Sequence, residues 1–292
     1  MCSSDLAELE TLLAQGQRDA AEALCRRRLE AGTAGERVRT ALASLLGGTE
    51  RWQELQSFAE ECLARDPQDA AAHNHLGIAR QYQNDAAGAV GHHRRALALR
   101  GDHAPFWLNL GNAQQRLGQF EEAIGCYERA RALGADEAPL LRNLGRALLE
   151  TGAPEAAVER FQQALASNPE DPELLNDLGQ AHIACGDAAR ALEAFRQALS
   201  LRPDDPDLQC NVGCALQQLR QNSAALPYLQ RVLEQRPAFV EAWNNLAVAL
   251  QHLDRLPEAI DHLHRALSLR PDYADGYANL ARSEEHTSEL QS

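Results

Sequence analysis

Polar residues, mostly asparagine, recur along this sequence at a constant interval of 34 residues. The column is occupied, in chain order, by His75, Asn109, Asn143, Asp177, Asn211, Asn245 and Asn279. An asparagine side chain carries both a hydrogen-bond donor and an acceptor. The backbone of an extended polypeptide needs both, whatever its side chains are. The column therefore predicts recognition of a polypeptide backbone and not covalent chemistry.

Residues that could carry other chemistry lack the partners that such chemistry requires. Cys210 and Cys214 are one helical turn apart, but a tetrahedral metal site needs four ligands and no further partner is evident. His262 and His264 have a spacing that does not place both rings on one helix face. The sequence shows no phosphate-binding glycine loop, nucleophile elbow or paired-carboxylate cleft. We therefore expect a chain that is not an enzyme and holds no cofactor and no metal.

The asparagine column belongs to a repeat of 34 residues, which we number from Ala70 as position 1, so that the column is position 6. Position 8 is small and reads Gly77, Gly111, Gly145, Gly179, Gly213, Ala247 and Ala281. Position 20 is alanine from Ala89 to Ala259. Position 24 is large in most repeats and reads Tyr127, Phe161, Phe195, Leu229 and Leu263. Glycine ends a segment at position 15, as Gly118, Gly152 and Gly186.

These columns predict a hairpin of two α-helices in each repeat. Small residues at positions 8 and 20 let two helices approach closely, and the large residue at position 24 fills the remaining gap. One hairpin cannot bury its own apolar face, so stability comes from stacking. Position 7, beside the asparagine column, is apolar in these repeats. Because one residue turns a helix by about 100°, position 6 is expected to face away from the buried side.

The repeat resembles the tetratricopeptide repeat family, through segments such as "WLNLGNAQQRLGQFEEAIGCYERA" and "LLNDLGQAHIACGDAARALEAFRQALSLRP". The resemblance covers residues 7–281 as about eight repeats and the start of a ninth, with the first two repeats matching less well. It implies an all-α, right-handed superhelical solenoid of antiparallel helix pairs. In this family the first helices line a concave groove, and positions 2, 5, 6, 9, 12 and 13 point into it.

The expected site is a groove for a protein or peptide, and it includes residues beside the position-6 column. These are Asn112, Arg142, Arg146 and Asn244. The column is similar to the peptide-binding ladder in the repeat arm of O-GlcNAc transferases, and it departs from that pattern at His75 and Asp177. Acidic residues at position 2 of later repeats suggest a ligand with a basic segment, although acids are also ordinary choices in a first helical turn.

Both ends of the sequence are expected to be non-native. Residues 282–292, "RSEEHTSELQS", lack the repeat and can be back-translated as a widely used sequencing-adapter oligonucleotide. The reverse complement of that oligonucleotide, read in frame, gives "MCSSDL", which is residues 1–6. We therefore expect the natural segment to be residues 7–281 of a longer protein, as in a metagenomic fragment, and exclude both ends from reasoning about the fold. All 28 basic residues are arginine, which indicates GC-rich coding in a bacterium.

Composition limits the possible partners. The formal net charge is −14, which argues against general nucleic-acid binding. No run of 18 or more apolar residues occurs, so we expect no membrane span. We expect a cytoplasmic location, with a signal peptide on the missing natural N-terminus left open as an alternative. The seven cysteines fit no disulfide framework and are expected to be reduced thiols.

The sequence thus predicts a protein-interaction scaffold whose groove binds an extended peptide or a partner segment. Two alternatives remain open. The chain could be the substrate-recognition arm of a larger protein glycosyltransferase, or an assembly or secretion factor that uses its convex face. The ligand and the oligomeric state are not indicated.

Overall fold

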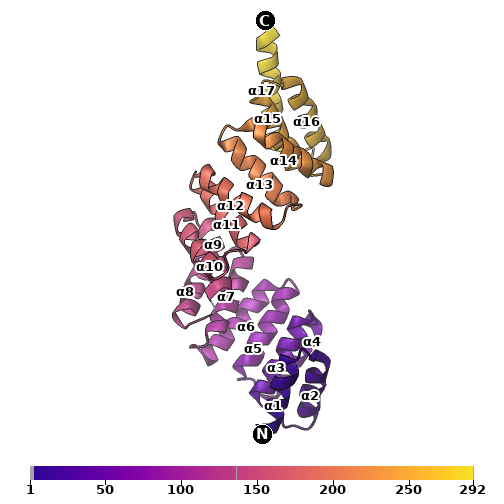
Figure 1. Cartoon of the computed structure of the whole chain (residues 1–292). Coiled ribbons are helices and arrows are strands. Elements are labelled where there is room, and N and C mark those ends of the chain that lie inside the picture. Colours follow the sequence, from indigo (N-terminus) through magenta and orange to yellow (C-terminus); the bar gives the residue numbers. More distant parts are fainter. Residues whose placement is uncertain (1–2, 136, 292) are drawn as a thin grey trace. The chain divides into compact units, whose positions relative to one another are not determined.

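The computed structural model of the chain describes residues 3–135 and 137–291, and side-chain burial for residues 7–135 and 138–287. Over these residues the chain forms seventeen α-helices and no strand, so the predicted all-α fold is confirmed (Figure 1). The helices are α1 (Ser3–Ala14), α2 (Arg18–Glu30), α3 (Glu36–Gly48), α4 (Trp52–Arg65), α5 (Ala70–Tyr82), α6 (Ala86–Leu99), α7 (Ala104–Arg116), α8 (Phe120–Ala132), α9 (Glu137–Glu150), α10 (Pro154–Ser167), α11 (Pro172–Ala184), α12 (Ala188–Leu201), α13 (Pro206–Gln218), α14 (Asn222–Gln235), α15 (Val240–Gln251), α16 (Leu256–Leu269) and α17 (Ala274–Gln291).

Each repeat forms one antiparallel pair, in which the odd-numbered helix comes first. The two helices of a pair pack together, as α5 packs on α6 and α11 on α12, and within each unit neighbouring pairs pack on one another, as α6 packs on α7 and α12 on α13. This nearest-neighbour packing is that of a solenoid. Of the two terminal segments expected to be adapter-derived, residues 1–2 and 292 lie outside the described part, and the remaining residues belong to α1 and α17.

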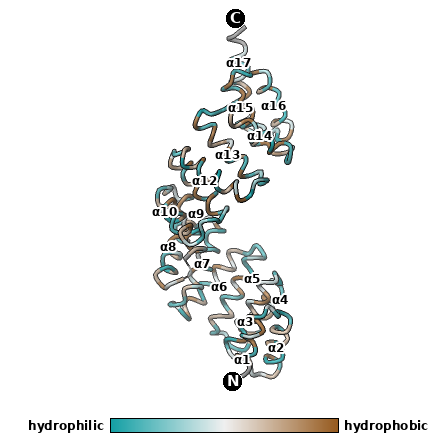
Figure 2. Tube along the Cα trace, in the orientation of Figure 1, coloured by the Kyte–Doolittle hydropathy of each residue, from teal (hydrophilic) through white to brown (hydrophobic). Residues whose placement is uncertain are grey.

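The chain divides into two compact units, residues 1–143 (unit 1) and residues 144–292 (unit 2). Each unit has its own apolar core. Leu42, Leu46 and Leu55 are among the most buried residues of a cluster in unit 1, and Phe195 and Leu216 belong to a cluster in unit 2. Hydrophobic and hydrophilic residues alternate along the helices in Figure 2, as expected for helices with one buried face.

The small residue at position 8 lets the two helices of a pair approach each other. A Cβ atom added to Gly111 of α7 would lie 2.6 Å from Cε1 of Tyr127 on α8, and one added to Gly145 would lie 2.6 Å from Cε1 of Phe161. Both aromatic rings are fully buried. The ring at position 24 therefore rests directly on the backbone at position 8, and a side chain added to Gly111 or Gly145 would push these pairs apart.

The first helix of most pairs ends in a residue with a left-handed backbone at position 15. Gly118, Gly152 and Gly186 have φ angles of 71°, 74° and 76°, as their spacing predicts. Arg220 and Asp254 occupy the same position without being glycine, with φ angles of 60° and 56°. The turn is therefore a property of the packed pair, and glycine only makes it less costly.

None of the described helices is long and apolar enough to cross a membrane.

Candidate functional site

The candidate site is the wall formed by the first helices of successive pairs. These helices contact one another directly within each unit, as α3 contacts α5, α5 contacts α7, α13 contacts α15 and α15 contacts α17. We call the residues at positions 2, 5, 6, 9, 12 and 13 of these helices the inner wall. The position-6 column runs along it.

Asparagine at position 6 links each pair to the pair before it. Asn211 of α13 donates a hydrogen bond through Nδ2 to Oδ1 of Asn176 on α11, at 2.8 Å. Two further side chains donate in the same way to the residue 35 positions earlier, at 3.0 and 2.8 Å; they are Asn109, to Asn74, and Asn279, to Asn244. The acceptor stands at position 5 of the preceding first helix. These amides are therefore held by a neighbouring hairpin and not by their own.

Two other members of the column make the same link to position 9 of the preceding helix. Nδ2 of Asn143 donates to Oδ1 of Asn112 at 2.9 Å, and Asn112 also accepts from the hydroxyl group of Tyr127 at 3.0 Å. Nδ2 of Asn245 lies 3.0 Å from Sγ of Cys214. The acceptor differs from repeat to repeat, but the donor and its direction are the same.

The two departures from asparagine behave differently. Asp177 is buried and receives two hydrogen bonds of 3.0 Å from Arg146, so an arginine at position 9 compensates for the acid at position 6. His75 makes no such bond within the described residues. Burial lowers the pKa of His75 to about 4, so its ring is neutral at pH 7. Arg142, at position 5 of α9, is half-buried.

Each linking amide keeps a carbonyl oxygen for another partner. Asn109, Asn143, Asn211 and Asn245 are all half-buried, and their Oδ1 atoms accept no hydrogen bond from the described residues. In Asn279 the oxygen accepts from Nη1 of Arg282 at 3.2 Å, in the segment expected to be non-native. An amide oxygen can accept a hydrogen bond from a backbone N–H group. The link also fixes the direction in which that oxygen points.

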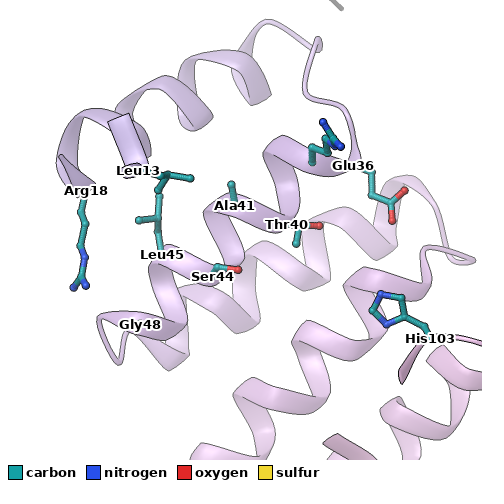
Figure 3. Close-up of a pocket in the computed structure, with 10 residues that line it drawn as sticks. Leu13, Arg18, Glu36, Thr40, Ala41, Ser44, Leu45, Gly48 and His103 are labelled. Carbon is teal, nitrogen blue, oxygen red and sulfur yellow. The ribbon is translucent and has the colours of Figure 1, made fainter. Parts of the chain in front are cut away.

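In unit 1 the inner wall encloses two open hollows. A hollow of 570 Å³ is lined by residues of α3, α5 and α7, including His75, Asn109 and Asn112. A second hollow of 680 Å³ shares Thr40, Ser44 and His103 with the first. Figure 3 shows Thr40, Ala41 and Ser44 projecting from one helix, while His103 comes from a separate segment. The hollows form here because the inner-wall residues of α3 at positions 5, 6, 9, 12 and 13 are small: Thr40, Ala41, Ser44, Gly47 and Gly48.

Three of the four acidic residues at position 2 of the later repeats are paired within their own repeats, and Asp275 is the exception among the described residues. Asp207 binds Arg236 and Glu241 binds Arg270, both at 2.8 Å, and Glu173 binds Arg202. In each case the arginine stands at position 31, at the end of the second helix. The acids thus carry little uncompensated charge, which weakens the expectation of a basic ligand.

Sequence reasoning did not predict that the amides are linked. Two acceptors at position 5, Asn74 and Asn176, were not named in the expected site. Asn112 and Asn244 were named, and both serve as acceptors, Asn112 for Asn143 and the buried Asn244 for Asn279. A second missed set acts on the backbone of the next helix: Nε2 of Gln217 and Gln251 donates to the main-chain oxygens of Asn245 and Asn279, at 2.7 Å. The signal was a fixed separation from the asparagine column, of 35 and 28 residues.

The fold and the wall define a helical-repeat scaffold, and comparisons give its family. Two family models described as tetratricopeptide repeat match residues 142–206 and 212–274, and residues 102–170, which together are more than half of the chain. The chain belongs to the tetratricopeptide repeat family. This fold generally serves as a non-catalytic scaffold for protein–protein interaction, with protein or peptide partners.

Solved structures share this fold. A chain of the APC/C hetero-tetramer Cut9–Hcn1 superposes with a TM-score of 0.68 at 22% identity, over 96% of this chain and 55% of that one. The C-terminal part of a TPR repeat-containing protein from Cytophaga hutchinsonii gives 0.63 at 16% identity, over 82% and 99%. Pseudomonas aeruginosa PilF gives 0.61 at 20% identity, over 75% and 99%. No curated protein sequence matches the chain.

Proposed function

We propose that the chain binds an extended polypeptide along its inner wall, through the position-6 carbonyl oxygens. The observation that supports the proposal is that these amides use their N–H groups in the same way and keep their oxygen atoms free of hydrogen bonds from the described residues. Each uses an N–H group to bind the preceding pair, and in Asn109, Asn143, Asn211 and Asn245 the oxygen accepts nothing from the described residues. A row of fixed acceptors suits a ligand whose donors are also regularly spaced.

The spacing of the position-6 side chains agrees with the residue spacing of an extended chain. Neighbouring helices pack about 8–10 Å apart, and an extended chain advances about 3.3 Å per residue. One position-6 side chain is therefore expected to contact the ligand at about every third ligand residue. Because the links already hold the amides, little side-chain entropy is lost on binding.

The row of position-6 amide oxygens is interrupted where another residue replaces asparagine. Asp177 is buried and bound by Arg146, and His75 has a different shape and a neutral ring. We therefore place the continuous contacts at Asn109 and Asn143 in unit 1 and at Asn211 and Asn245 in unit 2.

A matched pair of variants tests the proposal. Asn211→Ala removes both the link and the free oxygen, whereas Asn176→Ala removes the link and leaves Asn211 in place. Both should lower stability by about 0.5–1.5 kcal/mol, the value of one hydrogen bond. The probe is a fluorescent 15-residue peptide selected from a random library against the wild-type chain, measured by anisotropy.

We expect Asn211→Ala to weaken peptide binding about tenfold, which corresponds to about 1.4 kcal/mol. Asn176→Ala should change affinity less than about threefold. Equal losses in the two variants would mean that the column serves stability alone.

Both alternatives from the sequence are compatible with the same fold. A glycosyltransferase domain encoded downstream of the repeats in the same reading frame would make the wall a substrate-recognition arm. Partner binding that survives inner-wall substitutions but fails with substitutions on the second helices would favour an assembly factor that uses the convex face.

A further inference from the structure

The thiol groups of Cys210 and Cys214 lie together on the inner wall of unit 2. They occupy positions 5 and 9 of α13, one turn apart, and Nδ2 of Asn245 lies 3.8 Å from Sγ of Cys210 and 3.0 Å from Sγ of Cys214. Cys210 is buried and Cys214 is half-buried. Two sulfur atoms thus share one polar neighbour.

The neighbour shared by the two sulfur atoms is a hydrogen-bond donor. The N–H group of Asn245 is directed at both of them, and such a donor binds an ionised sulfur more strongly than a neutral one. A thiolate, and not a thiol, is the form that binds metals.

The separation on the helix suits a bridging atom better than a disulfide. Side chains four residues apart on a helix have Cβ atoms about 5–6 Å apart, whereas a disulfide needs about 3.5–4.5 Å. With a metal–sulfur bond of about 2.3 Å, a straight sulfur–metal–sulfur bridge places the sulfur atoms about 4.6 Å apart. The helix can accept that bridge by small side-chain rotations.

The number of ligands selects the kind of ion. Within the described residues, no group of three or more histidine, cysteine, aspartate or glutamate side chains is placed to hold a metal. Structural zinc needs four ligands and is therefore excluded at this pair. Soft thiolate ligands favour Cu(I), a d10 ion that two thiolates can coordinate in a straight line.

We propose that Cys210 and Cys214 bind one Cu(I) ion as a linear dithiolate on the inner wall. The step is an exchange of ligands: two thiols and Cu⁺ give a dithiolate complex of charge −1 and release two protons to solvent, with no change of oxidation state. It goes beyond peptide binding and does not depend on it.

The local charges permit this anionic complex. The carboxylates nearest to Cys210, Asp207 and Glu241, are each bound to an arginine at 2.8 Å, so they repel the complex less than free acids would. Asn245 donates an N–H group to a sulfur atom, and hydrogen bonds to a charged acceptor are stronger than those to a neutral one.

The test is a competition for Cu(I) under anaerobic conditions. The full chain is titrated against bathocuproine disulfonate, and the copper it withholds from the chelator is measured by absorbance. The variants are Cys210→Ala and Cys214→Ala, with Cys126→Ala and Cys185→Ala as controls away from the pair. Far-UV circular dichroism establishes that each variant is folded.

We expect Cys210→Ala and Cys214→Ala each to lose one equivalent of retained copper, while both controls keep it. Asn245→Ala should keep the equivalent but hold it more weakly. The wild-type chain should bind more tightly as pH rises, because two protons leave. A stoichiometry unchanged in either Cys210→Ala or Cys214→Ala, or no retained copper in the folded wild-type chain, would overturn the proposal.

Discussion

Unit 1 and unit 2 are built on one repeat but differ at position 24, where the second helix packs against the first. In unit 2 this position holds Phe161, Phe195, Leu229 and Leu263, all buried. In unit 1, α8 has the fully buried Tyr127 at this position, but α6 has His93, which is also fully buried, against Gly77. Its Nδ1 lies 3.0 Å from Oδ1 of Asn74, and because that oxygen is an acceptor, Nδ1 must carry the proton.

The comparison shows that position 24 of the repeat tolerates a polar side chain. A polar ring can occupy the most buried position if a partner is supplied from position 5, and Asn74 supplies it while also accepting from Asn109. The other ring nitrogen of His93 is buried without a partner, so burial lowers the pKa of His93 to about 4. Unit 1 therefore carries a pH sensitivity that the apolar residues of unit 2 lack.

The largest expected effect is in unit 2. Phe161→Ala removes a fully buried ring that rests on Gly145 and should lower the free energy of unfolding by about 3–5 kcal/mol. His93→Ala in unit 1 should cost less, because a smaller ring is lost. Urea denaturation followed by circular dichroism measures both, and a larger cost for His93→Ala would break the comparison.

Acid should destabilise unit 1 through His93. Its pKa in the fold is about 4, below the ordinary 6.5, so the unfolded chain binds the proton more readily. The contribution of neutral His93 to the free energy of unfolding is complete above pH 6.5. It is lost as the pH falls toward 4, by up to about 3 kcal/mol. His93→Phe should remove the part of the loss that His93 causes and leave the part that His75 causes, because burial also lowers the pKa of His75 to about 4. His264→Gln, at an exposed residue of unit 2, should leave the whole loss. The readout is the urea midpoint at pH 7, 5.5 and 4, and identical slopes for wild type and His93→Phe would contradict the assignment.

A smaller effect tests whether links between pairs are interchangeable. Arg146→Ala removes two hydrogen bonds from the buried carboxylate of Asp177 and should cost about 1–2 kcal/mol, because the arginine itself is half-exposed. Adding Asp177→Asn restores the residue common to the column and removes the buried charge. The double variant should regain part of the lost stability in thermal melts. If it is less stable than Arg146→Ala, the acid has another role.

The smallest effect concerns the turns. Arg220→Gly relieves a left-handed backbone at φ 60° and should raise stability by about 0.5–1 kcal/mol, by analogy with Gly118, Gly152 and Gly186. Asp254→Gly should gain less, because aspartate tolerates this conformation better. Differential scanning calorimetry on both variants checks the order, and a loss of stability in Arg220→Gly would contradict it.

The frame of the fold follows from the sequence, because positions 8, 15 and 24 each have one physical job that few residue types can do. The combination of Gly145 and Phe161, for example, predicts close contact between the two helices of that pair. The links were harder to predict, because asparagine, cysteine and arginine all serve in them, and no single column shows the pattern. The left-handed turn at Arg220 was also hard to predict, because arginine does not favour this conformation and the packing of the pair imposes it.

The link made by the position-6 amide, beside its proposed contact with the ligand, also explains why the site was only partly predicted. Spacing alone showed that Asn211 lies on the first helix, but not that its N–H group is already used by Asn176. Alanine substitution therefore affects stability and binding together, and a test on the ligand separates them.

The most direct test is a scan of N-methyl groups along the backbone of a bound 15-residue peptide. Methylation removes one N–H donor at a time and leaves the side chains unchanged. The account predicts affinity losses of about tenfold at every third residue or so, each matched to one position-6 oxygen, and little change between them. A peptide that binds equally well at every methylated position, or that depends only on its side chains, would contradict the claim that the amide oxygens hold the ligand.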